Sequence, residues 1–276
     1  MKVISLFFYL CFFHSIACTE KAFVIIICSR NNEARVKENL DSVFNQQYKN
    51  FRVIYIDDAS TDKTATLVKD YLTKNNKTHI CSFISNPTRM YKMHNFYHAV
   101  HSCKDHEIVI ELDGDDSFFD NEVLTYLNKI YQNNDVWLTY GGIVMKPHNL
   151  TSIKPKKIPL EMVKKKAFRN IMHEYWIFIA LRSFYAGLFK KIEPRSLKYK
   201  GKFFERGSDM LQMIPLFEMA GERFHCIEQP VYIYHTDTGA HDYQQDCSMQ
   251  SKASLFARHR KQYHRLKEAP FTCENQ

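Results

Sequence analysis

Three aspartates fall within four positions at the end of an apolar run. The segment IVIELDGDDSFFDNEVL covers residues 108–124, and the aspartates at its centre are Asp113, Asp115 and Asp116. Carboxylates this close repel one another unless a cation or a proton neutralises them. A Mg²⁺ or Mn²⁺ ion bound by one or two carboxylates and by phosphate oxygens is a common arrangement. The spacing therefore predicts a divalent-metal site, and the alternative is an acidic turn that caps the next helix.

A second acidic pair, Asp57 and Asp58, ends another apolar run within VIYIDDASTDKT, residues 53–64. A carboxylate at such a position can accept a hydrogen bond from a nucleobase N–H or from a ribose hydroxyl. Helix capping explains the nearby Asp62, but it leaves the pair itself unexplained. The pair therefore indicates a nucleotide site.

These acids belong to a chain in which short apolar runs alternate with amphipathic segments. Strands are expected at 22–28, 51–57, 80–85, 107–112 and 136–142. Helices are expected at 33–47, 61–74, 94–103 and 121–131. This alternation predicts parallel βαβ units in a sheet covered on both faces. Because ligands bind beyond the C-terminal ends of such strands, residues 28–31, 57–58 and 113–116 should meet in one crevice.

The regular alternation ends near residue 143. A basic stretch with several prolines continues to about residue 170, and we interpret it as a loop or lid. The elements expected beyond it are a mostly helical stretch at 173–192, a helix at 207–221, and a strand with a polar turn at 231–242. In the second of these, Ser208 should cap the helix, Gly221 should end it, and Pro215 should kink or break it.

Taken in order, the motifs resemble glycosyltransferase family 2, whose members have the GT-A fold. The resemblance rests on VIIICSRNNEARVKENLDSVFNQQYKNFRVIYIDDASTDKT, on ELDGDD as the Asp-x-Asp motif, on FERGSD (204–209) as the later Glu-Asp motif, and on PVYIYH (230–235). It covers about residues 22–145 closely and 173–240 more loosely. It implies an α/β fold with a Rossmann-like, mostly parallel central sheet flanked by helices.

The resemblance also implies a division of labour along the chain. Residues 22–145 would form the nucleotide-sugar-binding half. Residues 146–245 would form the acceptor-binding half with the catalytic base. Together they would make one GT-A domain over 22–245, followed by a C-terminal tail over 246–276.

Specific roles follow from the same resemblance. The implied donor-binding residues are Ser29, Arg30, Asp58, Arg89, Asp113 and Asp116. Asp113 and Asp115 would be the acids of the Asp-x-Asp motif, Asp116 would support them or touch the donor sugar, and Asp209 would be the catalytic base. The chain departs from the family pattern at two positions, because Ser208 stands where Glu is usual and Arg30 where Tyr is frequent.

Three further residues are candidates on chemical grounds. His235 follows an apolar strand and could be a third metal ligand beside Asp113 and Asp115, since imidazole binds Mn²⁺; its alternative is an ordinary polar residue at a strand end. Glu174 and Trp176, in HEYW, combine an acid with an aromatic ring, a mixture that suits sugar recognition. Their alternative is packing beneath the lid.

The implied reaction is a metal-assisted, inverting transfer of a hexose from a nucleotide-diphosphate sugar, with a UDP-sugar as the expected donor. The acceptor would be a hydroxyl of a glycan, a protein or a lipid. Asp209 would remove the acceptor proton as general base, and Mn²⁺ or Mg²⁺ would stabilise the leaving diphosphate. Two other classes stay open: a metal-dependent Asp-x-Asp phosphatase or phosphotransferase, and a non-catalytic nucleotide- or carbohydrate-binding module.

The net charge of +8 suits an anionic partner. We expect the nucleotide-sugar and a possible peripheral association with membranes, and we expect no nucleic acid. Residues 1–17 have the pattern of a signal peptide or short anchor. A signal peptide predicts the secretory pathway, either the lumen of the ER or Golgi, where nucleotide-sugars occur, or secretion. Without it, a membrane-associated cytoplasmic protein is expected.

Overall fold

The computed structural model describes residues 20–146, 151–153, 155–171, 180–237 and 247–272. The expected signal peptide at 1–17 and the candidates Glu174 and Trp176 therefore lie outside the described residues. In the described part of the chain, no helix has the length and apolar character needed to cross a membrane.

Eleven strands are assigned in the described residues: β1 (Phe23–Ser29), β2 (Phe51–Asp57), β3 (Cys81–Ser85), β4 (Ile108–Asp113), β5 (Ser117–Phe118), β6 (Leu138–Lys146), β7 (Thr151–Ile153), β8 (Arg182–Tyr185), β9 (Lys198–Tyr199), β10 (Lys202–Phe203) and β11 (Phe224–His235). The helices are α1 (Val36–Phe44), α2 (Thr64–Lys74), α3 (Lys92–His101), α4 (Val123–Tyr131), α5 (Leu160–Lys164), α6 (Phe168–Ile171), α7 (Ala186–Phe189), α8 (Ser208–Ala220) and α10 (Cys247–His259), with a 3₁₀ turn at Pro194–Leu197.

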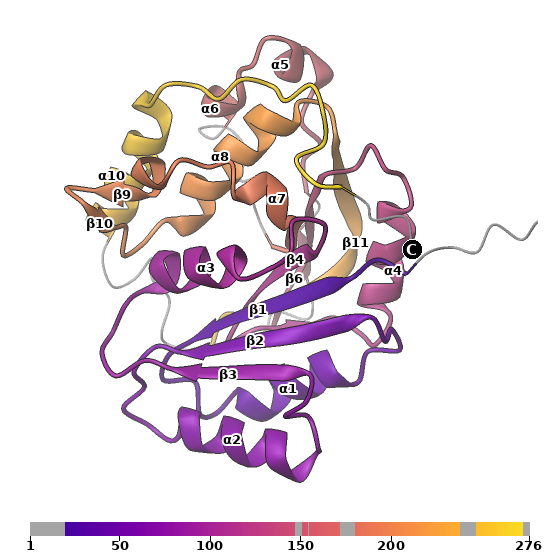
Figure 1. Cartoon of the computed structure of the whole chain (residues 1–276), viewed down its shortest axis with the longest axis vertical. Coiled ribbons are helices and arrows are strands. Elements are labelled where there is room, and N and C mark those ends of the chain that lie inside the picture. Colours follow the sequence, from indigo (N-terminus) through magenta and orange to yellow (C-terminus); the bar gives the residue numbers. More distant parts are fainter. Residues whose placement is uncertain (1–19, 147–150, 154, 172–179, 238–246, 273–276) are drawn as a thin grey trace, which may run out of the picture.

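A nine-stranded sheet forms the centre of the described structure, in the order β3-β2-β1-β4-β8-β6-β11-β5, with β7 paired to β6. Strands β3, β2, β1 and β4 are parallel, as are β6 and β11. Figure 1 shows α3 above β1–β3, and α1 and α2 below them. The expected α/β architecture, a mostly parallel sheet flanked by helices, is therefore confirmed.

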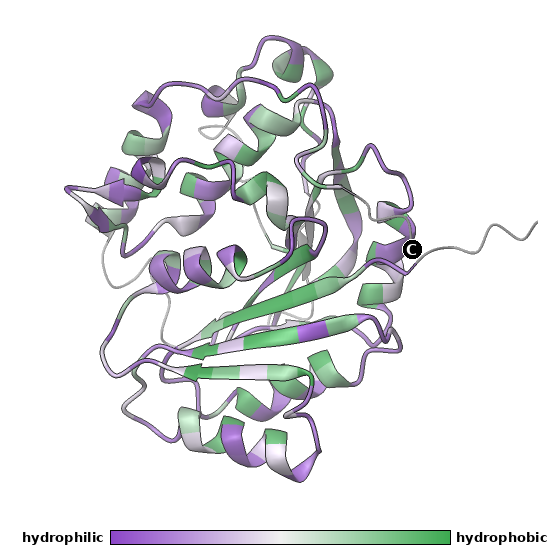
Figure 2. Cartoon of the chain, in the orientation of Figure 1, coloured by the Kyte–Doolittle hydropathy of each residue, from purple (hydrophilic) through white to green (hydrophobic). Residues whose placement is uncertain are grey.

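The buried strands explain why the first half folds as expected. Residues Phe23 to Ile27 of β1 are at most 1% exposed, and Ile108 to Leu112 of β4 are equally buried. Both strands are apolar along most of their length (Figure 2), as a sheet covered on both faces requires. The strand predicted at 51–57 coincides with β2.

The mostly helical stretch expected at 173–192 is wrong for Arg182–Tyr185. These residues form β8, which runs antiparallel between β4 and β6, and all four are buried. A short apolar run does not distinguish a buried strand from a buried helix by its periodicity. Here backbone pairing with β4 on one side and β6 on the other stabilises a strand, and the helix that follows, α7, is short.

The helix α8 corrects the expected cap and confirms the expected end. Gly207, with φ +74°, occupies the cap position before Ser208, and no side chain caps this helix among the described residues. A Cβ on Gly207 would lie 2.7 Å from the Cβ of Ala253 in α10, so this close approach also requires glycine. The helix continues through Pro215 without a break and ends at Gly221, which has φ +67°.

The basic stretch after residue 143 is more ordered than the expected loop. Strand β6 continues to Lys146, β7 pairs with it, and α5 and α6 follow. The C-terminal helix α10 packs against α8 and α6. A buried ion pair stabilises this corner, since Arg169 Nε donates to Glu218 Oε1 at 2.6 Å.

Candidate functional site

The ends of three parallel strands lie side by side. Ser29 at the end of β1 is level with Asp57 on β2, and Cys28 is level with Asp113 on β4. Backbone hydrogen bonds join the residues that follow β2 and β4 to the end of β1. Asp58 N donates to Ser29 O at 2.8 Å, and Gly114 N donates to Cys28 O at 3.3 Å. The expectation that these strand ends meet at the C-terminal edge of the sheet is confirmed, and a donor-binding crevice at this edge stays a prediction.

Gly114 lets the aspartate turn approach β1 closely. A Cβ on Gly114 would lie 2.4 Å from both Cβ and Oγ of Ser29, well inside van der Waals contact. Ser29 is buried, and its Oγ accepts a hydrogen bond from Asn32 Nδ2 at 3.1 Å. The structure thus gives Ser29 a packing position beneath the turn, and its contact with a donor stays a prediction.

Asp58 anchors the loop that joins β3 to α3. Its carboxylate accepts hydrogen bonds from Asn86 Nδ2 at 2.9 Å, from Met90 N at 2.8 Å and from Tyr91 N at 2.9 Å. Burial raises the pKa of Asp58, but these hydrogen bonds outweigh it and hold the pKa below its usual value. Tyr91 has φ +66° and ψ 158°, a strained conformation for any residue but glycine.

Two predicted donor-binding arginines border the same crevice. Arg30 Nη1 donates to Asp58 O at 2.6 Å and also to Ala59 O, so it braces the end of β2. Arg89 is exposed, and its guanidinium lies 4.4 Å from the centre of the Tyr91 ring. Of the two, Arg89 is the one whose charge faces solvent near the crevice.

Asp116 differs from its two neighbours. Its carboxylate is buried and accepts hydrogen bonds from Tyr232 Oη at 2.6 Å and from His235 N at 2.9 Å. Burial, and then the charges of Asp115 and Asp113, raise the pKa of Asp116 well above its usual value. Asp116 thus ties the aspartate turn to β11, as the supporting role implies, and its contact with a donor stays a prediction.

His235 does not complete the expected metal site. Its Nε2 lies 3.4 Å from Ser117 Oγ and 3.5 Å from Glu38 Oε1, so this side of the ring faces β5 and α1. Across the described ranges, no three or more His, Cys, Asp and Glu side chains are grouped as metal ligands would be. The expected set of Asp113, Asp115 and His235 is therefore not assembled.

Two carboxylates still fit a divalent cation. Asp113 and Asp115 are both partly exposed at the strand end, and carboxylate oxygens suit Mg²⁺ and Mn²⁺. Such ions commonly complete their shell with phosphate oxygens and water. The residues that would hold the ion are thus Asp113 and Asp115, with the remaining ligands supplied by the donor and solvent.

A buried ionic network lies directly behind these carboxylates. Glu111, on β4, is 1% exposed and accepts hydrogen bonds from Arg182 Nε at 2.8 Å and from Gln212 Nε2 at 2.6 Å. Lys92 Nζ lies 2.7 Å from Glu111 Oε1 and also contacts Asp113 Oδ1. Burial favours the neutral acid, but the charges of Arg182 and Lys92 lower the pKa of Glu111 to about 2.

The network links the aspartate turn to the helix that carries the predicted base. Asp209 lies in the first turn of α8, one turn before Gln212. Burial lowers the pKa of Arg182, but the charges of Glu111, Asp113 and Asp209 raise it above its usual value. The guanidinium of Arg182 thus interacts electrostatically with both Asp113 and Asp209.

Sequence reasoning missed three members of this network, Glu111, Arg182 and Gln212. A signal was present, since Glu111, Arg182 and Gln212 each interrupt an apolar run: EIVIELD, IALRSF and MLQMIP. A charge inside such a run must be paired when it is buried. Its partner cannot be read from the sequence, because the three segments are far apart along the chain.

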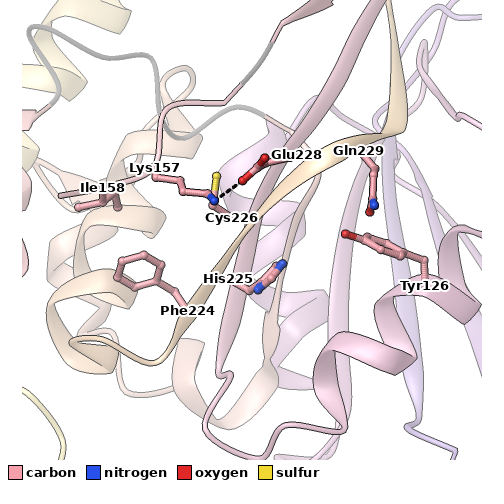
Figure 3. A pocket seen from close by; sticks show the side chains of 8 residues that line it. All are labelled: Tyr126, Lys157, Ile158, Phe224, His225, Cys226, Glu228 and Gln229. Carbon is pink, nitrogen blue, oxygen red and sulfur yellow. Dashed lines mark ion pairs between the residues drawn. The ribbon is translucent and has the colours of Figure 1, made fainter. Parts of the chain in front are cut away.

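A pocket in the described residues lies away from the aspartate turn. It has a volume of about 400 Å³ and is formed by the first part of β11 with α4 and the segment before α5 (Figure 3). Lys157 and Glu228 form an ion pair at its edge. The aspartate turn contacts the other end of β11, at Tyr232 and His235, so this pocket is separate from the turn.

Comparison with known proteins agrees with this arrangement. The family model described as "Glycosyl transferase family 2" matches residues 24–192. The chain belongs to glycosyltransferase family 2. An uncharacterized glycosyltransferase of Rickettsia typhi is 30% identical over 186 residues, which are 63% of this chain and 54% of that protein. One of Methanocaldococcus jannaschii is 25% identical over 157 residues, 55% of this chain and 53% of that protein. The chain spans about half the length of these curated relatives.

Solved structures give this family 2 chain its fold class. Residues 1–349 of S. aureus TarS, solved in complex with UDP-GlcNAc, have a TM-score of 0.56 and 17% identity, over 80% of this chain and 60% of that chain. The mannosyltransferase PcManGT of Pyrobaculum calidifontis, solved with GDP-Man and Mn²⁺, has a TM-score of 0.52 and 19% identity, over 79% of this chain and 58% of PcManGT. The fold is GT-A, as the resemblance implied.

Proposed function

We propose that this family 2 chain is an inverting hexosyltransferase that uses a nucleotide-diphosphate sugar, with a UDP-sugar as the first donor to test. The observation that carries the proposal is the juxtaposition of the Asp113–Asp115 turn with the first turn of α8 through Glu111 and Arg182. The solved complexes of TarS with UDP-GlcNAc and of PcManGT with GDP-Man support this donor class.

The proposed step needs one base and one stabilised leaving group. The acceptor hydroxyl oxygen forms a bond to C1 of the donor sugar, its proton passes to the Asp209 carboxylate, and the bond from C1 to the diphosphate oxygen breaks with its electron pair on the diphosphate. Attack from the face opposite the leaving group inverts C1. A Mg²⁺ or Mn²⁺ ion at Asp113 and Asp115 would neutralise charge on the leaving diphosphate. The acceptor is a hydroxyl of a glycan, a protein or a lipid.

The experiment measures release of UDP from a panel of UDP-hexoses with Mn²⁺, with and without EDTA. We expect release that EDTA abolishes and that Asp115→Ala removes. Asp209→Asn should lower kcat by about 10²–10⁴-fold, the usual contribution of a general base, while the affinity for UDP stays the same. Asp135→Asn, at an exposed position, is the matched control and should retain full activity.

Two outcomes would overturn the proposal. Hydrolysis of simple phosphate esters without sugar transfer would favour the Asp-x-Asp phosphatase. Binding of UDP-sugars without turnover, with Asp209→Asn indistinguishable from the natural sequence, would favour a binding module.

We also propose that the protein associates peripherally with anionic membranes. The hairpin of β9 and β10 carries the exposed residues Tyr199, Lys200 and Lys202. Tyr199 contacts Phe256 of α10, with ring centres 6.1 Å apart, and the adjacent Leu255 is 56% exposed. Lysines beside exposed aromatic and aliphatic side chains suit a membrane surface, because they combine charge attraction with shallow apolar insertion.

A further inference from the structure

We propose that Lys92 is a tethered cation of the donor site, which neutralises Asp113 in the free protein and binds the diphosphate once the donor arrives. The inference deepens the proposed function and rests on it. Its basis is the position of Lys92 Nζ, in contact with Asp113 Oδ1 and 2.7 Å from Glu111 Oε1. One ammonium group thus touches both the buried network and the aspartate turn.

Charge balance assigns Lys92 to Asp113 rather than to Glu111. Arg182 already forms two hydrogen bonds with Glu111, at 2.8 Å and 3.0 Å, and both residues are buried. A buried carboxylate and a guanidinium joined by a bidentate hydrogen bond have no net charge as a pair. The positive charge of Lys92 is therefore left for Asp113, whose side chain is 29% exposed.

Lys92 is also placed where an incoming anion can reach it. Its side chain is 26% exposed, so the ammonium group borders the crevice instead of lying within the core. Lys92 is the first residue of α3, and the backbone at the N-terminus of a helix of this length attracts anions as well. Glu111 and Asp58 hold this position from two sides, through Lys92 Nζ and through the N–H of Tyr91.

Lys92 should affect the binding of a divalent cation and the binding of a nucleotide in opposite directions. A divalent cation and Lys92 compete for the Asp113 carboxylate, so Lys92 weakens cation binding when no donor is present. When a cation takes Asp113, the ammonium group keeps Glu111 as its anchor and its charge becomes available to a diphosphate oxygen. Lys92 therefore strengthens nucleotide binding, even without metal.

The test uses the full chain and two binding measurements. Mn²⁺ binding to the donor-free protein is measured by electron paramagnetic resonance, and UDP binding in EDTA is measured by calorimetry. In Lys92→Met we expect Mn²⁺ to bind more tightly and UDP to bind more weakly, each by about tenfold, the size of one lost charge-assisted contact. Lys92→Arg keeps the charge and should leave both affinities within about threefold.

Lys190→Met is the matched control. Lys190 also pairs with a carboxylate, Asp105, at 2.7 Å, and its side chain is 23% exposed, but it lies beside α7. Neither affinity should change in this variant.

The outcomes separate the inference from the proposed function. Weaker binding of both Mn²⁺ and UDP in Lys92→Met, or no change in either, would overturn the role of Lys92, since a merely structural lysine cannot tighten Mn²⁺ binding. If Lys92→Met does not fold, a changed affinity in Lys92→Arg for either ligand beyond about tenfold would overturn it instead. A natural sequence that binds neither UDP nor a UDP-sugar would sink the proposed function itself.

Discussion

Among single residues, the three aspartates of ELDGDD show how one charge type takes different roles. Asp116 is buried against Tyr232 and the backbone of His235, whereas Asp113 and Asp115 are partly exposed. Gly114 lets the turn pack tightly onto Ser29, and Asp116, the last residue of the motif, contacts β11. The tightness of this turn is itself testable.

Gly114→Ala should destabilise the protein by about 1–3 kcal/mol, the usual cost of overpacking. The new Cβ would lie 2.4 Å from two side-chain atoms of Ser29, so Ser29→Gly in the same chain should recover part of the loss. Urea unfolding of the two single variants and the double variant gives the coupling free energy. Strictly additive effects would contradict the proposed clash.

Among the elements, β4, β8, α3 and α8 are joined by the charges around Glu111. Each element contributes one member: Glu111, Arg182, Lys92 and Gln212. A buried ion pair of this kind adds little net stability over an apolar pair, but removal of one partner leaves a buried charge. The network therefore makes the position of α8 relative to β4 sensitive to a single substitution.

Glu111→Gln should cost about 3–5 kcal/mol at neutral pH, because Arg182 is left without its counter-charge. The folded pKa of Glu111, about 2, lies below its ordinary value of 4.5. Its contribution is thus complete above pH 4.5 and is lost as the pH falls toward 2. The difference in unfolding free energy between the natural sequence and Glu111→Gln should shrink over that range.

Chemical denaturation between pH 2 and pH 7 measures this difference. Glu122→Gln, at an exposed position, is the control and should change stability by no more than about 0.5 kcal/mol. A cost below about 1 kcal/mol for Glu111→Gln, well under that of a broken buried pair, would contradict the role of the network.

In the molecule as a whole, β8 and β11 pair with strands of residues 22–145 in one sheet, and the basic hairpin of β9 and β10 extends from one side of the described structure (Figure 1). The net charge of +8 is consistent with attraction to an anionic surface. The hairpin and α10 form one described surface, since Tyr199 and Phe204 both contact Phe256.

Reversal of two hairpin charges, Lys200→Glu with Lys202→Glu, should weaken binding to phosphatidylglycerol vesicles by about tenfold or more, since each lysine near such a surface contributes about 1 kcal/mol. Co-sedimentation measures the bound fraction. Lys69→Glu with Lys74→Glu makes the same charge change on α2 and should bind as the natural sequence does. Equal losses in both pairs would indicate an effect of net charge alone.

Much of the first half was predictable because its signals are local. The apolar run 51–57 forms β2 over the same residues, and the helix expected at 33–47 contains α1. Side-chain periodicity depends only on neighbours along the chain, so strands, helices and the acidic strand ends could be recognised without the tertiary structure. Where periodicity is uninformative, as at Arg182–Tyr185, the prediction was wrong.

The sequence by itself determined the βαβ order and the carboxylates that end β2 and β4. Only the tertiary structure decided which of those carboxylates face the crevice, that His235 faces Glu38, and that Lys92 bridges Glu111 to Asp113. The physical reason is sequence distance: Glu111 lies 71 residues from Arg182 and 101 from Gln212. Strand register and helix packing bring such partners together, and no local pattern of residue types encodes that pairing.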